Sequence, residues 1–574
     1  MTEIKRFFER YDSTGNELSY NEPRITGDDS LSLFHPRDKG LKIVIINPPI
    51  REWSYPNIMP LGQGYVASVA MMDGHKVYVL DLNALRQKPI ESSPIKFSKW
   101  VSGEIIKCLE NHVPDVICIG GIITQYKRIK EITTLCKKSL PNVPIILGGG
   151  IASCMPEFMV QRLPIDVAVQ KEGEITFSEV LTRIEKDLSL EGCKGIVYRY
   201  NNGKTDWEVK NNGLRGSVAA GWKKGLSKNG DGLNSFPWPL RSKWPIDEVY
   251  KNNPVGHLNW ASKWNQGAPG EGTPYSISML ASRGCPYAVS SCDYCYASYL
   301  GVAYRLRSPK EVVDEMAYLK RRYDLKYVHF LDDLMMTDYR WALEFFDEIK
   351  KRNKRDGFEI EFGCTSRTNI IADDIKRAKN EGRQNILEAG YEVGWRQVGY
   401  GVESASPTIL KLIDKSGQTV EKMETAILET QRVMGYADCS FMIASPGESE
   451  KTVKETVDFC KKVGLAPEVF FFTTAYPATP FWDLALEKGL IGKAVTGKNC
   501  EADDDIIEQF FIKLGEQGDE VRTNFSDLSD EKIIDLSWWA VQELGAQNTL
   551  RHPHTGDIQN VQKSKARGAT VTDL

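Results

Sequence analysis

Short apolar runs alternate along the chain with segments in which apolar residues recur every three or four positions. After residue 41 these runs are apolar throughout, and helical patterns such as 61–72 separate them. This arrangement is typical of a parallel sheet with helices on both faces. We therefore expect a doubly wound, Rossmann-like parallel sheet over residues 41–200, closed by a small strand at 194–200. Its main strands are expected at 41–49, 75–82, 114–121, 143–150 and 165–174.

A second series of the same kind begins at residue 275. Helical patterns separate its apolar runs, and those at 308–323 and 448–464 carry helix start and stop residues. Six strands alternating with helices predict a partial (β/α)6 TIM-type barrel over 273–490, with its chemistry at the carboxyl ends of the strands. The strands are expected at 275–285, 326–333, 358–367, 396–404, 438–448 and 467–477.

Three further segments complete the expected α/β organisation. Residues 1–40 form an N-terminal extension, and residues 201–272, rich in Gly, Asn, Pro and Trp, are interpreted as a linker. Residues 491–574 are expected to form a helical C-terminal region with a polar, frayed tail.

Composition narrows the class of protein. The 574 residues carry a net charge of -4, which gives no general attraction to nucleic acid. No apolar stretch is long enough to predict a membrane span, and the first residues do not resemble a signal peptide. We expect a cytoplasmic protein with no nucleic-acid partner.

Three cysteines stand close together in RGCPYAVSSCDYC, residues 283–295, directly after an expected strand. Cys285, Cys292 and Cys295 have the spacing C-x6-C-x2-C. A structural zinc site normally takes a fourth Cys or His, and none lies between residues 258 and 328. A [4Fe-4S] cluster held by three thiolates keeps one iron open for another ligand. The alternative is three buried thiols, the interpretation that suits the single cysteines elsewhere.

These residues resemble the radical S-adenosylmethionine (SAM) enzymes, in the branch with an N-terminal cobalamin-binding domain. RGCPY and CDYC match the ends of the family's cysteine motif, although six residues, not three, separate the first two cysteines. FLDD (330–333), SR (366–367), GYGVES (399–404), SPGES (445–449) and AYPATPFW (475–482) follow in the family's order. The resemblance implies that Cys285, Cys292 and Cys295 hold the [4Fe-4S] cluster. It assigns the following residues to SAM: Tyr294, Asp332, Asp333, Ser366, Arg367, Glu403 and Ser404.

The resemblance also assigns cobalamin to the first domain. The fold alone leaves a flavin or nucleotide open, although no G-x-G-x-x-G or P-loop fingerprint follows a strand. The D-x-H-x-x-G motif that ligates cobalt in other cobalamin proteins is absent, and His75 is interpreted as a turn or surface residue. The residues implied for cobalamin are Pro48, Leu61, Gly120, Gly121, Thr124, Gly148, Gly149, Glu172, Gly173 and Glu174.

The activity implied is methylation of an unactivated carbon of a small-molecule or peptide substrate. The reduced cluster would cleave SAM to a 5′-deoxyadenosyl radical, and cobalamin would supply the methyl group. A reducing partner such as flavodoxin or ferredoxin is implied as electron donor. Two alternatives remain open: a cyclase or rearrangement enzyme with the same cofactors, and a non-enzymatic iron–sulfur or corrinoid carrier. A methylthiotransferase would need a second three-cysteine motif, which the upstream cysteines lack.

Overall fold

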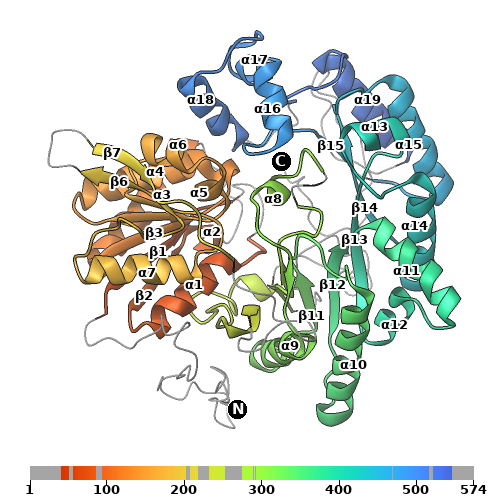
Figure 1. Cartoon of the computed structure of the whole chain (residues 1–574), viewed down its shortest axis with the longest axis horizontal. Coiled ribbons are helices and arrows are strands. Elements are labelled where there is room, and N and C mark those ends of the chain that lie inside the picture. The colour runs from red at the N-terminus through yellow and green to blue at the C-terminus, as the bar shows by residue number, and fades with distance from the viewer. Residues whose placement is uncertain are drawn as a thin grey trace.

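The computed structural model describes residues 40–545 except 51–55, 86–93, 202–206, 218–231, 253–274, 289, 291, 468 and 516–520. Two curved sheets stand side by side, and helices cover their outer faces (Figure 1). In the described part of the chain, no helix is long and apolar enough to cross a membrane.

The first sheet has the strand order β2-β1-β3-β4-β5-β6-β7. Its first five strands in this order are parallel, and β6 and β7 add an antiparallel edge. Ile43 and Ile45 of β1 belong to one apolar core and Val44 and Ile46 to another, so both faces are buried as expected. The strands are β1 (Lys42–Asn47), β2 (Lys76–Asp81), β3 (Val116–Gly120), β4 (Ile145–Gly148), β5 (Val167–Val169), β6 (Ile196–Asn201) and β7 (Trp207–Asn211).

Helices and short turns connect these strands. Helices α1 and α7 pack together, as do α3 and α4. The connecting elements are α1 (Leu61–Met72), α2 (Leu82–Leu85), α3 (Pro94–His112), η2 (Ile123–Gln125), α4 (Tyr126–Ser139), α5 (Gly150–Cys154), α6 (Pro156–Arg162) and α7 (Glu174–Glu185). The predicted helix over 61–72 has the bounds of α1.

The second sheet confirms the partial barrel. Six parallel strands follow the order β15-β14-β13-β12-β11-β8 and form an open, curled sheet (Figure 1). The rings of Trp341, Phe345, Phe362 and Trp395 are buried in its core; Trp341 stacks on Phe345 and Phe362 on Trp395, while Phe345 and Phe362 meet edge to face. The strands are β8 (Ser276–Met279), β11 (Tyr327–Phe330), β12 (Glu361–Ser366), β13 (Trp395–Glu403), β14 (Asp438–Ile443) and β15 (Phe470–Phe472).

Local start and stop residues set the ends of the barrel helices. Helix α9 begins with Pro309, and α15 begins after Ser449, whose side chain accepts from the Thr452 amide. Gly464 ends α15 in the left-handed conformation, which glycine adopts without strain. The helices are α9 (Pro309–Tyr323), α10 (Tyr339–Asp356), α11 (Thr368–Glu381), α12 (Ile386–Glu392), α13 (Pro407–Leu412), α14 (Val420–Met434) and α15 (Glu450–Val463).

The C-terminal helices connect the two halves. Helix α18 packs on α4 and η2 of the first sheet, and α19 packs on α15 of the barrel. The buried Tyr126 hydroxyl donates to Glu508 across 2.6 Å, and Lys130 also contacts this carboxylate. The helices are α16 (Pro480–Glu487), α17 (Leu490–Thr496), α18 (Asp504–Leu514) and α19 (Asp530–Glu543).

Three local features differ from the sequence expectations. The apolar run at 275–285 is not one strand, because β8 ends at Met279 and β9 (Ser282–Arg283) pairs antiparallel with β10 (Arg305–Leu306). β7 lies within 201–272, so the first sheet continues into the segment interpreted as a linker. The interpretation of His75 as a turn or surface residue was wrong about its exposure: the side chain is buried, and its Nδ1 accepts from the Leu41 amide across 3.0 Å.

Candidate functional site

The three cysteines lie on the arm between β9 and β10, at the carboxyl end of the first barrel strand. Cys292 has a φ of +64°, and the Cys295 amide donates to the Cys292 carbonyl across 2.8 Å. The arm is fastened to the segment after α13: the Cys292 amide donates to the Asp414 carbonyl across 2.7 Å, and Asp293 donates to Ile413 across 3.2 Å. The loop is therefore held by backbone hydrogen bonds.

The thiols suit iron–sulfur ligation by their chemistry. Burial, with a smaller contribution from negative charge on Cys292 and Cys295, raises the pKa of Cys285 to about 11, so the three groups influence one another. Soft thiolates on one loop are the usual ligands of such clusters. Within the described residues, no three or more His, Cys, Asp or Glu side chains are arranged as a set that could hold a metal ion. The donors fit the cluster, although their side chains are not gathered around one point.

Tyr294 joins a buried polar network beside this loop. Its hydroxyl donates to Glu403 Oε1 across 3.0 Å, and Lys415 Nζ lies 2.8 Å from the same oxygen and 2.7 Å from the hydroxyl. Burial, followed by the charge of Glu403, raises the pKa of Tyr294. Lys415 was not predicted from the sequence, because a lysine in a loop resembles any solvated lysine until its partners are known.

The backbone places Glu403 with little freedom. Glu403 has a φ of +66° at the end of β13, where the register with β14 shifts. A Cβ on Gly401 would lie 2.4 Å from Glu403 Oε1, so glycine is needed to admit this carboxylate. The predicted residues Tyr294 and Glu403 are thus brought together, and Ser404 instead bonds Thr456 Oγ1 across 3.1 Å.

Two aspartates follow β11 and have different surroundings. Asp332 is buried and accepts from the Ala281 amide and from the Ser282 hydroxyl, so it braces the end of β8. Burial raises the pKa of Asp332 to about 6. Asp333 is exposed, and its charge contributes to the raised pKa of Cys285. Asp333 is thus close enough to the cysteine loop to act on Cys285, whereas Asp332 supports the end of β8.

Arg367 follows β12 and is a buried cation. Its guanidinium lies 3.8 Å from the centre of the Tyr287 ring, donates to the Ser416 carbonyl across 2.8 Å and approaches Cys292 Sγ to 4.0 Å. Among the described residues no carboxylate forms an ion pair with it, and its Nε has no hydrogen-bond partner. The adjacent Ser366 hydroxyl is also buried without a partner. A buried guanidinium of this kind favours an anionic ligand.

Glycines stand at or directly after the carboxyl ends of β3 and β4 in the first sheet. A Cβ on Gly149, whose φ is +84°, would lie 2.6 Å from the Gly121 carbonyl oxygen, so a side chain there would meet the backbone of the loop after β3. Gln125 Nε2 donates to the Pro48 carbonyl across 3.1 Å and ties the β1 loop to η2. The predicted residues gathered at the ends of β1, β3 and β4 or in the segments after them are Pro48, Leu61, Gly120, Gly121, Thr124, Gly148 and Gly149.

Glu172 and Glu174 have a different environment, because they bind arginines of the cysteine arm. Arg283 contacts Glu172 across 3.0 Å and also pairs with Glu174, and Arg305 lies 2.7 Å from Glu172. Burial raises the pKa of Glu172, but its bonds with Arg305 and Arg283 outweigh burial and leave that pKa lowered. Gly173 lies between the two glutamates. These ion pairs join the loop after β5 and the start of α7 in the first domain to the β9–β10 ribbon of the second.

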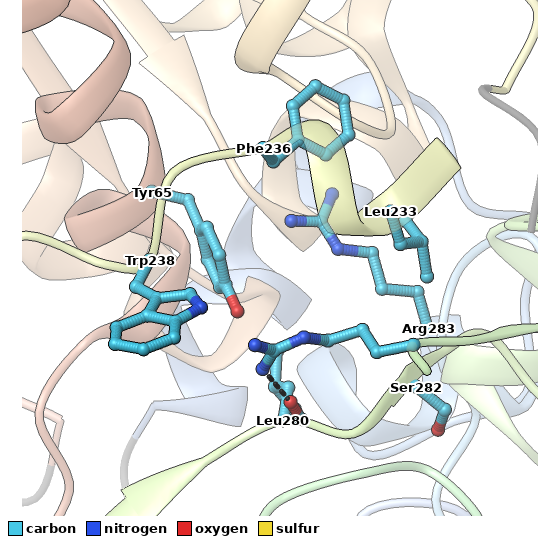
Figure 2. A pocket seen from close by; sticks show the side chains of 8 residues that line it. Tyr65, Leu233, Phe236, Trp238, Leu280, Ser282 and Arg283 are labelled. Atoms are coloured by element: carbon cyan, nitrogen blue, oxygen red, sulfur yellow. Dashed lines mark hydrogen bonds between the residues drawn. The ribbon is translucent and has the colours of Figure 1, made fainter. Parts of the chain in front are cut away.

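The same arginine borders a small cavity (Figure 2). The Arg283 guanidinium lies 4.7 Å from the Tyr65 ring centre and 5.3 Å from that of Phe236, and Trp238 also borders the space. The cavity measures about 10 Å³, the room of about one water molecule. It belongs to the joint between the sheets and is too small for a substrate.

A Rossmann-like sheet joined to a partial barrel, with three cysteines after the first barrel strand, defines a radical SAM enzyme with an added ligand-binding domain. Comparison with known families agrees: the B12 binding domain matches residues 54–181, and the Radical SAM superfamily matches residues 279–460. The chain belongs to the cobalamin-binding radical SAM enzymes. The resemblance inferred from the sequence is confirmed.

Proteins of similar sequence include two methyltransferases and a cyclase. An uncharacterized methyltransferase of Pyrococcus horikoshii is 27% identical over 79% of this chain and 85% of its own. Cytidylyl-2-hydroxyethylphosphonate methyltransferase of Streptomyces wedmorensis is 22% identical over 75% and 79%. An anaerobic magnesium-protoporphyrin IX monomethyl ester cyclase of Synechocystis is 22% identical over 68% and 66%.

Solved structures share the fold. The radical SAM methyltransferase TsrM of Kitasatospora setae, solved with cobalamin and a [4Fe-4S] cluster, has a TM-score of 0.57 at 18% identity, over 80% of this chain and 79% of its own. The cobalamin-dependent SAM radical enzyme OxsB, solved with aqua-cobalamin and SAM, has a TM-score of 0.57 at 17% identity, over 83% and 66%. At these identities the likeness establishes the architecture.

Proposed function

We propose that this enzyme uses a [4Fe-4S] cluster, SAM and cobalamin to methylate an unactivated carbon of a small-molecule or peptide substrate. One observation carries the proposal: a single loop contacts both halves of the molecule. Its Cys292 and Tyr294 contact the barrel network, while Arg283 binds the loop after β5 of the first sheet. A cluster held on this loop would lie between the SAM residues and the cobalamin-binding edge.

The residues divide among the three cofactors. We assign the cluster to Cys285, Cys292 and Cys295, and SAM to the network around Glu403 and the buried Arg367. When bound, these cofactors supply the radical that removes a substrate hydrogen and the methyl group that replaces it.

The protein's own part is to hold charge and orientation. Lys415 neutralises Glu403 within a buried pair and fixes its free oxygen for a ligand hydroxyl. Arg367 offers a desolvated cation for a carboxylate such as that of SAM, and its stacking on Tyr287 keeps the guanidinium plane fixed. Such preorganised groups lower the cost of ordering the ligand.

The substrate class and electron donor belong to the same proposal. The similar proteins act on a cytidylyl phosphonate or are solved with tryptophan, which supports a small organic substrate. A flavodoxin or ferredoxin of the cytosol would deliver the electron, because the cluster needs a strongly reducing partner.

The test needs no knowledge of the substrate. Anaerobically reconstituted protein is incubated with hydroxocobalamin, a chemical reductant and SAM labelled in its methyl group. We expect 5′-deoxyadenosine, S-adenosylhomocysteine and label on cobalamin, all followed by mass spectrometry. Deoxyadenosine without transfer of label would contradict the methyltransferase assignment.

Cyclisation or rearrangement is the second candidate, favoured by the cyclase relatives, one of which is 25% identical over 60% of this chain. Under that function SAM is cleaved but its methyl group stays out of the product. The labelled reaction therefore separates the two functions. Formation of neither deoxyadenosine nor labelled cobalamin would favour a non-enzymatic carrier.

A further inference from the structure

A chain of hydrogen bonds crosses three strand ends of the first sheet. The Asp81 carboxylate accepts from Asn47 Nδ2 across 2.8 Å at the ends of β2 and β1. Gln63 Nε2 then donates to Asn47 Oδ1 across 3.3 Å and to the Gly120 carbonyl across 3.1 Å at the end of β3. Gln63 therefore bridges β1 and β3 from the first turn of α1.

These two strands mark the place where the strand order reverses. The order β2-β1-β3 means that the chain turns outward on opposite sides of this point. In doubly wound sheets, ligands bind in the crevice that opens there, beyond the carboxyl ends of the strands. Helix α1 also lies on the side of the sheet toward the barrel (Figure 1), where Tyr65 contacts Arg283.

The bridge leaves one atom unsatisfied. The Gln63 side chain is only 8% exposed, and its Oε1 has no hydrogen-bond partner among the described residues. Its two amide hydrogens are already directed at Asn47 and Gly120, which fixes which end of the amide is the oxygen. A buried acceptor without a partner is costly and calls for a donor.

The ligand must therefore present an N–H or O–H group at this point. A phosphate or carboxylate would place a second electron-rich oxygen against Gln63 Oε1 and be repelled. Cobalamin carries primary amides around its corrin ring, and each amide has two N–H donors. The neighbouring Gly120 makes room for the Gln63 side chain, because a Cβ there would lie 3.0 Å from Gln63 Cγ.

We propose that Gln63 binds cobalamin by accepting a hydrogen bond from one peripheral amide of the corrin ring. This inference rests on the proposed use of cobalamin by the first sheet. It adds a residue outside the predicted set and assigns the oxygen, not the nitrogen, as the contact.

The test combines a change in the protein with a change in the ligand. Full-length protein binds either hydroxocobalamin or isomers in which one peripheral amide is hydrolysed to a carboxylate, and affinities are read from the absorbance of bound corrinoid. Gln63→Met removes the acceptor at nearly constant size, together with the Nε2 donor that bonds Asn47 and Gly120. We expect it to weaken hydroxocobalamin binding about 5- to 30-fold, the range of one lost buried hydrogen bond.

The decisive result is coupling between the two changes. In the wild type, one isomer should bind more weakly because its carboxylate meets Gln63 Oε1, and that isomer alone should lose this penalty in Gln63→Met. Gln125 provides the matched control, since it is equally buried but both ends of its amide have partners. Gln125→Met should change all isomers by the same factor.

The outcomes separate this inference from the function it rests on. Wild-type protein that binds no corrinoid overturns both. If the wild type binds corrinoid tightly but the effects of Gln63→Met and of amide hydrolysis add for every isomer, only the role of Gln63 is overturned. A buried water or the protein scaffold then explains the unsatisfied oxygen.

Discussion

Lys415 and Glu403 form a buried ion pair, with Nζ 2.8 Å from Oε1 and both side chains at most 10% exposed. The pair joins the loop after α13 to the end of β13, and Tyr294 completes it from the cysteine loop. Three elements thus meet at one carboxylate.

Replacing Lys415 by Met should leave Glu403 buried without its cation. Loss of one partner from a buried pair costs about 3–5 kcal/mol, so we expect a lower thermal unfolding temperature and weaker SAM binding. Calorimetry and equilibrium dialysis with SAM measure the two effects. Lys415→Arg keeps the charge and should retain most of both, whereas equal losses in the two variants would contradict the ion-pair argument.

Cys292→Ala should abolish the cluster and with it the cleavage of SAM. The variant loses one of three proposed ligands, and a ligand set of two should not retain the iron. Iron analysis and deoxyadenosine formation check the result. Cys108→Ala, on α3 of the first sheet, is the control and should keep full iron content. Normal SAM cleavage by Cys292→Ala would overturn the cluster assignment.

Arg283→Met should loosen the contact between the two sheets. It leaves Glu172 and Glu174 without their shared partner, and we expect a destabilisation of about 3–5 kcal/mol, as for other broken buried pairs. The thermal transition should fall and trypsin should cleave between the sheets more readily. Lys351→Met, which removes only exposed pairs of α10, should leave both measurements unchanged. A variant with unaltered cleavage would contradict the role of Arg283 as a joint.

Glu448 should make stability fall as pH rises. Burial raises its pKa from 4.5 to about 7, so between those values the folded protein keeps a proton that the unfolded chain has lost. The resulting loss in the free energy of unfolding is absent below pH 4.5 and grows between pH 4.5 and 7. Above pH 7 it is complete and reaches on the order of 3 kcal/mol.

Glu448→Gln imitates the protonated side chain and should be more stable than the wild type at pH 8 but not at pH 4. Thermal unfolding over this pH range provides the measurement. Glu487→Gln, at an exposed position of α16, should follow the wild-type profile. Parallel profiles for Glu448→Gln and the wild type would show that Glu448 does not titrate in this window.

Much of the architecture was predictable because it depends on local patterns. Apolar runs identified the strands of both sheets except β7, although the strand ends were placed too widely, since apolar residues continue into buried turns. The spacing of the three cysteines likewise singled out the loop at residues 283–295 as the candidate cluster site. These features are encoded within a few neighbouring residues.

The surroundings of the site were not predictable in the same way. Lys415, Arg283 and Gln63 acquire their roles from partners distant in the sequence, such as Glu172 for Arg283. Glu172 and Glu174 illustrate the converse: similarity placed them with cobalamin, and the structure shows the arginines that they bind. The sequence pattern carries no record of such pairings.

Arg283 stands two residues before Cys285, yet its partners belong to the other sheet. The ion pairs of Arg283, beside the loop proposed to hold the cluster, therefore form only when the two halves of the molecule are docked. A barrel expressed without the first domain would lack the two carboxylates that bind Arg283, and we expect it to take up iron poorly. We therefore expect cluster loading to depend on the docking of the two halves.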